Sequence, residues 1–91
     1  MQWRLFADIA ETAGAHDIEL DLDGDATVDD ALSALLDRHP ELTDEVLDNG
    51  ELAGHLTVLK NGTNVDGFDA GFDSPVAPDD ELALFPPISG G

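Results

Sequence analysis

The feature that most constrains this chain is one capped amphipathic helix within only 91 residues. Thr27 followed by Asp30 approximates a capping box, which starts a helix, although Glu or Gln is the better partner. Pro40 ends the segment, because a proline cannot continue a helix. Four apolar residues recur between these limits at helical spacing: Val28, Leu32, Leu35 and Leu36. This apolar stripe must be buried, so the other segments have to supply a surface for it.

The segments before this helix predict two short strands. Residues 2–6 are apolar and predict the first strand, and residues 7–13 have a helical spacing that Gly14 can end. Residues 16–22 alternate apolar and acidic side chains, which is typical of a strand with one face in water. The main helix therefore follows two strands and a helical turn between them.

The segments after the helix predict three more strands. Residues 55–60 are strand-like, and residues 63–65 return as a short strand. Between them, Asn61 and Gly62 are the strongest hairpin signal in the chain, because a type I′ turn needs a positive φ at both positions. The last strand is predicted at residues 82–85 and ends at a proline pair, which cannot donate to a sheet.

Two irregular stretches connect these elements. Residues 41–54 are ambiguous and predict a short helix followed by a loop at Asn49-Gly50. Residues 66–80 contain three glycines and two prolines and are predicted to be loop. The order of two strands, a helix, a connection and three strands predicts an α+β domain with a mixed sheet packed on one main helix.

Acidity limits the partners that this chain can have. Its 21 Asp and Glu residues against Arg4, Arg38 and Lys60 give a net charge of −18, which disfavours nucleic acid and anionic membranes. The acids are spread from Asp8 to Glu81 without a single block, so adaptation to molar salt is favoured over a local acidic docking surface. At ~1 M salt the Debye length is only ~3 Å, which screens the self-repulsion.

Several classes of site are disfavoured by missing patterns. The absence of Cys excludes disulfides, thiolate metal sites and a Cys nucleophile. The histidines lack metal-ligand spacing, and the acidic stretch at residues 21–25 has Ala26 and Leu32 where a calcium loop needs Gly and Glu, so no metal is expected. Apolar runs fall short of the ~20 residues of a membrane helix, and no signal-peptide pattern is present, so a cytoplasmic location is expected.

The end of the chain carries the chemistry that its body lacks. Residues 1–85 are predicted to be the folded domain and residues 86–91 a flexible tail. The proline pair favours an extended path away from the sheet, and the glycine pair removes the bulk that would block entry to a narrow active site. The reactive group is then the terminal carboxylate of Gly91. The candidate conjugation residues are Gly91 and Gly90, and the candidate docking residues are Phe85, Pro86, Pro87, Ile88 and Ser89.

Three stretches resemble one family of ubiquitin-like proteins. The segment from Phe6 to Gly14 resembles the family's opening, the segment from His55 to Gly62 its central hairpin, and residues 79–91 its ending. On these residues the chain resembles the small subunit of molybdopterin synthase and the small archaeal modifier proteins. Ile88 and Ser89 depart slightly from the Val-Ala or Val-Ser pair commonest in that family.

The resemblance implies a β-grasp fold and a carrier cycle. An ATP-dependent adenylating enzyme of the ubiquitin-activating type would convert Gly91 to an acyl-adenylate, so ATP is used by that partner and the chain itself binds no cofactor. A sulfur donor would then give a thiocarboxylate for the large subunit of molybdopterin synthase, or a lysine of a target protein would give an isopeptide. Both outcomes use Gly91, so the sequence leaves the choice open.

Three rival interpretations remain. One is a β-grasp interaction module without tail chemistry, in which the tail is dispensable. Another is an enzyme with its own active site, which ranks last because no catalytic constellation is present. A carrier role in thiamine synthesis is disfavoured, because the resemblance implies that those carriers are shorter and lack a Pro-Pro ending.

Lys60 is the possible isopeptide acceptor within the chain itself. It is the one lysine, so chains of this protein linked through isopeptide bonds must join Gly91 to Lys60, with the Met1 amine as the other amine available. The favoured alternative is a solubilising charge at a strand end. Residues beside hairpin turns are usually exposed, so the ammonium group is expected to reach solvent.

Overall fold

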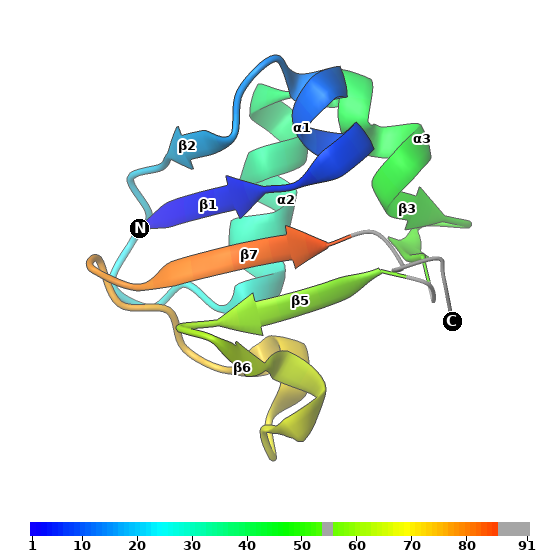
Figure 1. Ribbon diagram of the computed structural model, residues 1–91. Coiled ribbons are helices and arrows are strands. Elements are labelled where there is room, and N and C mark those ends of the chain that lie inside the picture. The colour runs from blue at the N-terminus through cyan, green and yellow to red at the C-terminus, as the bar shows by residue number, and fades with distance from the viewer. Residues whose placement is uncertain (54–55, 86–91) are drawn as a thin grey trace.

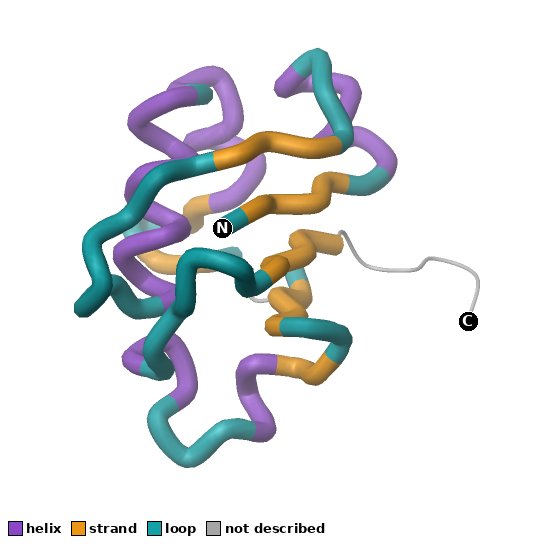
Figure 2. Tube along the Cα trace, turned by 90° about the vertical axis from the view of Figure 1, so that its left-hand side faces the viewer, coloured by secondary structure: helices purple, strands orange, loops and turns teal. Residues whose placement is uncertain are grey.

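The computed structural model describes residues 1–53 and 56–85. Its strands are β1 (Gln2–Leu5), β2 (Asp17–Glu19), β3 (Leu47–Asp48), β4 (Glu51–Leu52), β5 (Thr57–Lys60), β6 (Thr63–Asn64) and β7 (Glu81–Phe85). Its helices are α1 (Ala7–Ala13), α2 (Val28–Arg38) and α3 (Thr43–Val46), with three short 3₁₀ helices, η1 (Pro40–Leu42), η2 (Val65–Gly67) and η3 (Gly71–Asp73). The sheet and the main helix α2 form two layers (Figures 1 and 2).

The main sheet has the strand order β2-β1-β7-β5-β6. Its central pair, β1 and β7, is parallel, and every other neighbouring pair is antiparallel. The helix α2 covers one face of this sheet (Figure 1). A mixed sheet with the first and last strands parallel at its centre and one helix across it is the β-grasp, ubiquitin-like fold. The predicted fold class is therefore confirmed.

The core forms where alternate residues of the central strands meet α2. Trp3 and Leu5 of β1 lie beside Leu82 and Leu84 of β7, and all four side chains are fully buried. The indole N–H of Trp3 donates to the carbonyl of Ala31 on α2 over 3.0 Å, which satisfies the polar atom of an otherwise apolar side chain. Strands and helix are thus joined by packing and by one directed hydrogen bond.

The predicted capping box starts α2. The backbone N–H of Asp30 donates to the Thr27 hydroxyl over 3.2 Å, and the N–H of Thr27 donates to the Asp30 carboxylate over 3.0 Å. The helix ends at Arg38, before the predicted stop at Pro40. Three residues of the predicted stripe are buried, whereas Leu36 is only half-buried. The prediction that Asp30 substitutes for Glu in the box is confirmed.

Two hairpins contain the same tight turn. Asn61 and Gly62 have φ angles of 49° and 86°, as the sequence predicts for the β5–β6 turn. Asn49 and Gly50 have φ angles of 55° and 84° and join β3 to β4, where the sequence predicts only a loop. That prediction is incomplete because strands of two residues are too short to show alternation.

Other elements are shorter than the sequence predicts. Within residues 16–22 only Asp17–Glu19 pairs as a strand, and Val65 begins η2 instead of ending β6. The predicted loop at residues 66–80 contains part of η2 and all of η3. No helix in the described ranges is both long enough and apolar enough to cross a membrane.

Candidate functional site

The central strand β7 leads directly to the predicted tail. Leu82 and Leu84 anchor this strand on the core, and it ends at Phe85. Residues 86–91, which include the predicted sites Pro86, Pro87, Ile88, Ser89, Gly90 and Gly91, lie outside the described residues. The structure therefore places the residue from which the tail begins, and this residue is held by the best-packed strand of the sheet.

An aromatic pair marks the end of β7. The rings of Phe6 and Phe85 stack with 4.3 Å between their centroids and 11° between their planes. The stack follows from the strand register, because Leu5 lies opposite Leu84 in the parallel pair and each phenylalanine is the next residue. Both rings are only half-buried, so their outer surfaces remain open to a partner.

The stack continues into an apolar patch on the sheet face opposite α2. Leu59 of β5 lies opposite Ala83 of β7, two residues before Phe85. Side chains alternate between the faces of a strand, so Leu59, Ala83 and Phe85 share the face away from the buried Leu84. We call the four residues Phe6, Leu59, Ala83 and Phe85 the aromatic patch. Sequence reasoning missed Phe6 and Leu59, although both are apolar residues next to core positions.

Charged side chains frame this patch. The guanidinium of Arg4, which lies opposite Ala83, is 3.4 Å from Asp17 and 3.8 Å from Glu81. These side chains are about half exposed to solvent, so their ion pairs contribute little to stability. Their effect is to give the apolar patch a polar rim, and protein interfaces commonly combine an apolar centre with such a rim.

Lys60, the predicted acceptor, lies at the other end of β5. Its Nζ atom is 3.7 Å from the Asp80 carboxylate and 5.7 Å from the centre of the Phe68 ring. Its side chain is only 19% exposed, which is less than its place beside a hairpin turn predicts. Lys60 pairs with Leu82 in the register, whereas Thr57 pairs with Phe85. The fold therefore does not bring Lys60 to the residue that precedes the tail.

Asp80 organises the turn before β7. Its carboxylate accepts the Ala77 N–H over 2.7 Å and the Asn61 side-chain amide over 2.9 Å. These two hydrogen bonds, with a smaller contribution from Lys60, hold the pKa of Asp80 below its ordinary value. Asn61 also accepts the N–H of Glu81 over 3.0 Å. The cluster ties the β5–β6 hairpin to the start of the strand that leads to the tail.

The described residues contain no group of three or more His, Asp or Glu side chains arranged to hold a metal ion. His39 follows α2 and lies 2.9 Å from Glu41, and this hydrogen bond lowers the pKa of the Glu41 carboxyl. His55 lies outside the described residues.

Comparison with known proteins finds a family model, curated relatives and solved structures that match this chain over almost all of its residues. The ThiS family model matches residues 3–91. Small archaeal modifier protein 1 of Haloferax volcanii is 52% identical over 92 residues, which cover the whole of both chains. Small archaeal modifier protein 3 of the same organism is 35% identical over 91 residues, which cover 100% of this chain and 98% of that one. The crystal structure of SAMP1 from Haloferax volcanii superposes with a TM-score of 0.89 at 51% identity, over 100% of this chain and 98% of that one.

The chain belongs to the ThiS family of β-grasp proteins. Within it, the chain is a ubiquitin-like protein of the small archaeal modifier type, which makes it a modifier protein and not an enzyme. The Haloferax origin of both curated relatives agrees with the halophilic character that the acidic composition predicts.

Proposed function

We propose that the chain acts through the carboxylate of Gly91. An adenylating enzyme of the ubiquitin-activating type joins this carboxylate to the AMP part of ATP and releases pyrophosphate. A nucleophile then attacks the acyl carbon and AMP leaves. Hydrosulfide supplied by a sulfur donor gives a thiocarboxylate for molybdopterin synthesis, and the amine of a target lysine gives an isopeptide with loss of a proton. ATP is consumed at the partner, and this chain supplies the acyl group and the surface by which it is recognised.

The observation that carries this proposal is the aromatic patch at the end of β7. A tail that enters another protein's active site needs a rigid base, which the buried Leu82 and Leu84 provide. It also needs a docking surface beside that base, and the half-buried Phe6 and Phe85 offer one. The family match, which extends to residue 91, supports the assignment of the reactive end to Gly91.

Four partners follow from this cycle. They are the adenylating enzyme, a sulfur donor, the large subunit of molybdopterin synthase, and lysines of target proteins. We place the cycle in the cytoplasm, where ATP and cofactor synthesis are available to it. The net charge of −18 opposes nucleic acid or an anionic membrane as a further partner.

Deletion of Gly90 and Gly91 tests the proposal. The purified chain is mixed with ATP and the adenylating enzyme from the same cells, and pyrophosphate release is measured. The full chain should release pyrophosphate, whereas the deletion variant and a variant with one alanine added after Gly91 should not. Emission from Trp3, which is fully buried, checks that each variant is folded. Pyrophosphate release by the deletion variant at the rate of the full chain would contradict the need for Gly90 and Gly91. No release with the full chain would instead support an interaction module without tail chemistry.

Intact mass of the protein isolated from its native cells separates the two outcomes. Replacement of one carboxyl oxygen by sulfur identifies the carrier form. Peptide mapping identifies the modifier form where lysines of other proteins carry a C-terminal peptide of this chain that ends at Gly91. Detection of both forms would show that one chain serves both roles.

A further inference from the structure

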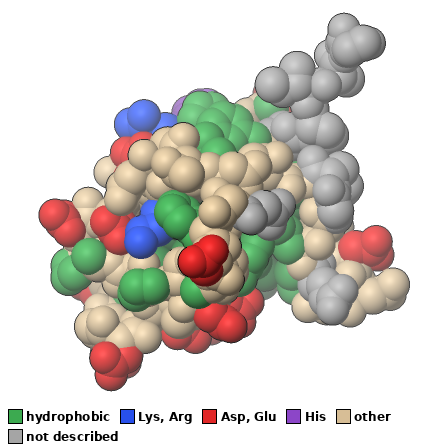
Figure 3. Space-filling model, turned by 90° about the horizontal axis from the view of Figure 1, so that it is seen from below, with side chains coloured by type: hydrophobic (Ala, Val, Ile, Leu, Met, Phe, Trp, Pro, Cys, Tyr) green, Lys and Arg blue, Asp and Glu red, His purple; other side chains and the backbone are tan. Residues whose placement is uncertain are grey.

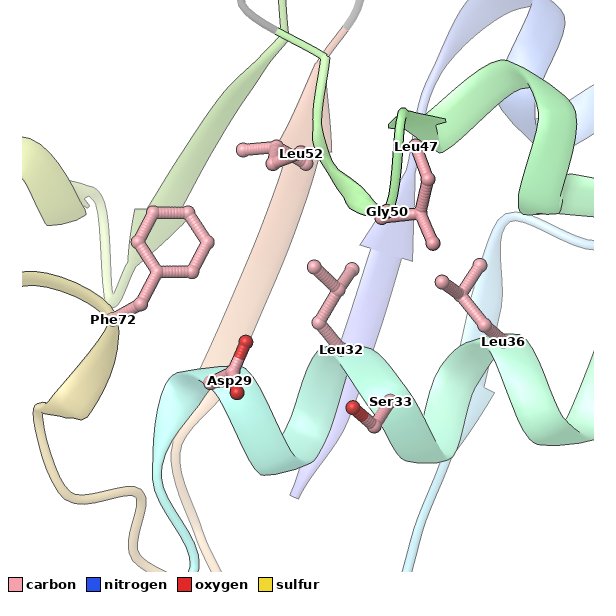
Figure 4. Close-up of a pocket in the computed structure, with 8 residues that line it drawn as sticks. All are labelled: Asp29, Leu32, Ser33, Leu36, Leu47, Gly50, Leu52 and Phe72. Atoms are coloured by element: carbon pink, nitrogen blue, oxygen red, sulfur yellow. The ribbon is translucent and has the colours of Figure 1, made fainter.

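A groove opens on the α2 side of the molecule, across the sheet from the aromatic patch. It lies between α2, the β3–β4 hairpin and η3, and its volume is about 350 Å³. Figure 4 shows leucine side chains of α2 and of the hairpin directed toward one another, with Phe72 at one end. Its apolar lining consists of Leu32, Leu36, Leu47, Leu52 and Phe72.

This lining is incompletely buried by the chain itself. Leu32 forms a buried floor, but Leu36, Leu47, Leu52 and Phe72 are each only half-buried. Single exposed apolar residues are normal on a protein surface, whereas several that converge in one hollow mark an interaction site. The apolar stripe of α2 therefore continues past the core to Leu36, which lines the groove together with Leu47 and Leu52 of the β3–β4 hairpin.

The edge of the groove is acidic and has no cation of its own. Asp29 lines it, and the exposed Asp48 and Asp73 directly follow the lining residues Leu47 and Phe72. In the described part of the chain, no lysine or arginine pairs with any of these three acids. The basic side chains are engaged elsewhere: Arg4 with Asp17 and Glu81, Arg38 with the Glu19 carbonyl, and Lys60 with Asp80. Cations that neutralise this edge must come from a partner.

We propose that this groove docks a basic amphipathic segment of a partner protein. Aliphatic side chains of the segment sit on the leucines, and its flanking Lys and Arg residues meet Asp29, Asp48 and Asp73. A helix with apolar residues at i, i+3 and i+7 presents this arrangement. A second copy of this chain is a poorer occupant, because two surfaces with a net charge of −18 each repel one another.

The groove and the side chains of the aromatic patch lie on opposite faces of the sheet. The groove therefore stays accessible while that patch is engaged. A protein that reads this modifier, whether free or attached to a target, can bind it through α2. This inference does not rest on the chemistry proposed for Gly91.

The test uses the full chain labelled with ¹⁵N and a synthetic helical peptide. The peptide carries leucines at i, i+3 and i+7 and Lys or Arg at its flanking positions. Titration at ~1 M KCl, where charge attraction is screened, should shift amide signals of residues 29–36, 47–52 and 72. A peptide with each leucine replaced by serine should bind about tenfold more weakly or worse, because it lacks the apolar anchors.

Two variants with the same change in net charge provide the matched control. Ser33→Lys places a cation at the groove, and Asp37→Asn removes an anion outside it; both positions are exposed on α2. At ~0.1 M KCl, where charges are less screened, Ser33→Lys should weaken binding of the leucine peptide about tenfold, because a like charge opposes its basic residues. Asp37→Asn should leave the affinity for this peptide nearly unchanged under the same conditions. Emission from Trp3 confirms that both variants are folded.

Three results would overturn the proposal. One is an equal loss of affinity for the leucine peptide in Ser33→Lys and Asp37→Asn. Another is equal affinity of the native chain for the leucine and serine peptides. Either result would indicate unspecific attraction to an acidic surface. The third is a concentration-dependent shift of the groove signals without peptide, which would assign the groove to a second copy of this chain.

Discussion

At the scale of single residues, Asp80 shows how one carboxylate can fix a strand that it does not belong to. It accepts hydrogen bonds from the Ala77 backbone and from the side chain of Asn61, and it pairs with Lys60. Asn61 in turn accepts the N–H of Glu81, the first residue of β7. Hydrogen bonds to a charged acceptor are stronger than neutral ones, so this cluster sets where the central strand begins.

Asp80→Asn should lower the free energy of unfolding by about 1 kcal/mol near neutral pH, because it replaces charge-assisted hydrogen bonds with neutral ones. The pKa of Asp80 is lowered from 3.8 in the folded state, so its stabilisation is full above that value and is lost as pH falls through the folded pKa. The difference in the free energy of unfolding between the native chain and Asp80→Asn, measured with urea, should therefore disappear below about pH 4.

Asp79→Asn is the matched control for this prediction. It removes the same charge from the neighbouring residue, whose exposed side chain has no hydrogen bond or ion pair within the described ranges. The control should leave the free energy of unfolding nearly unchanged or raise it slightly by relieving repulsion. Equal losses for both variants would mean that net charge, and not the hydrogen bonds of Asp80, is responsible.

Lys60 is the residue on which self-linkage depends. Its Nζ atom is paired with Asp80 and lies over the Phe68 ring, whereas an attacking amine has to be free to reach the acyl carbon. We therefore expect Lys60→Arg to leave modification of other proteins unchanged and to remove only chains linked through residue 60. Peptide mapping of conjugates from cells with either protein checks this. Persisting ladders in the arginine variant, without linkage through Met1, would contradict it.

Contacts between distant residues explain what the sequence could not predict at this scale. The Thr27–Asp30 cap was predictable because both partners lie within one turn of helix. Asp80 and Asn61 are 19 positions apart, and Phe6 meets Phe85 only through the register of β1 and β7. No local pattern in a single sequence encodes such pairs.

At the scale of elements, β7 joins the stability of the domain to its function. One of its faces is buried against α2, and its other face contributes Ala83 and Phe85 to the aromatic patch. The burial of Leu82 and Leu84 therefore fixes both the core and the position of Phe85, the last described residue before the predicted tail. A central strand, unlike an edge strand, is held by neighbours on both sides.

Leu59→Asp should weaken binding of the adenylating enzyme about tenfold, because it places an unpaired charge within the proposed apolar interface. Thr63→Asp is the matched control, since it adds the same charge at an exposed position of β6. Binding of each variant to the purified enzyme can be measured by calorimetry, with Trp3 emission as the check on folding. Equal affinities would exclude the aromatic patch as the docking surface.

Elements were predictable in proportion to their length. The 11 residues of α2 carry a cap, an apolar stripe and a stop signal, so its limits were predicted closely. The paired strands β3 and β4 have two residues each, and η3 has three, which is too little for any period to appear. The groove beneath β3 and β4 depends on these short elements, so no sequence pattern predicts it.

At the scale of the whole molecule, charge is the dominant property. The net charge of −18 is carried on an accessible surface of 5380 Å². Acidic side chains are scattered over the face seen in Figure 3 and do not gather in one block. The few ion pairs of Arg4 and Lys60 neutralise only a small part of this charge. Self-repulsion in the folded state is therefore general, and salt should relieve it.

Urea unfolding at increasing KCl concentration tests this expectation, because urea adds no ions. The midpoint, followed by Trp3 emission, should rise between ~0.1 M and ~1 M KCl as the Debye length falls from ~10 Å to ~3 Å. Salt also strengthens apolar burial to some degree, so the rise alone does not identify repulsion as its cause. A variant with fewer acids is needed to separate the two effects.

The triple variant Asp37→Asn, Asp69→Asn and Asp79→Asn supplies that separation. All three side chains are exposed, so their replacement removes negative charge with little change in packing. If self-repulsion is the cause, the variant should be more stable than the native chain at ~0.1 M KCl and should gain less from added salt, because less repulsion remains to be screened. Equal gains would assign the effect of salt to apolar burial. A native midpoint that does not move would mean that the acids are not self-repelling, and the interpretation of the acidity as a local docking surface would then be favoured.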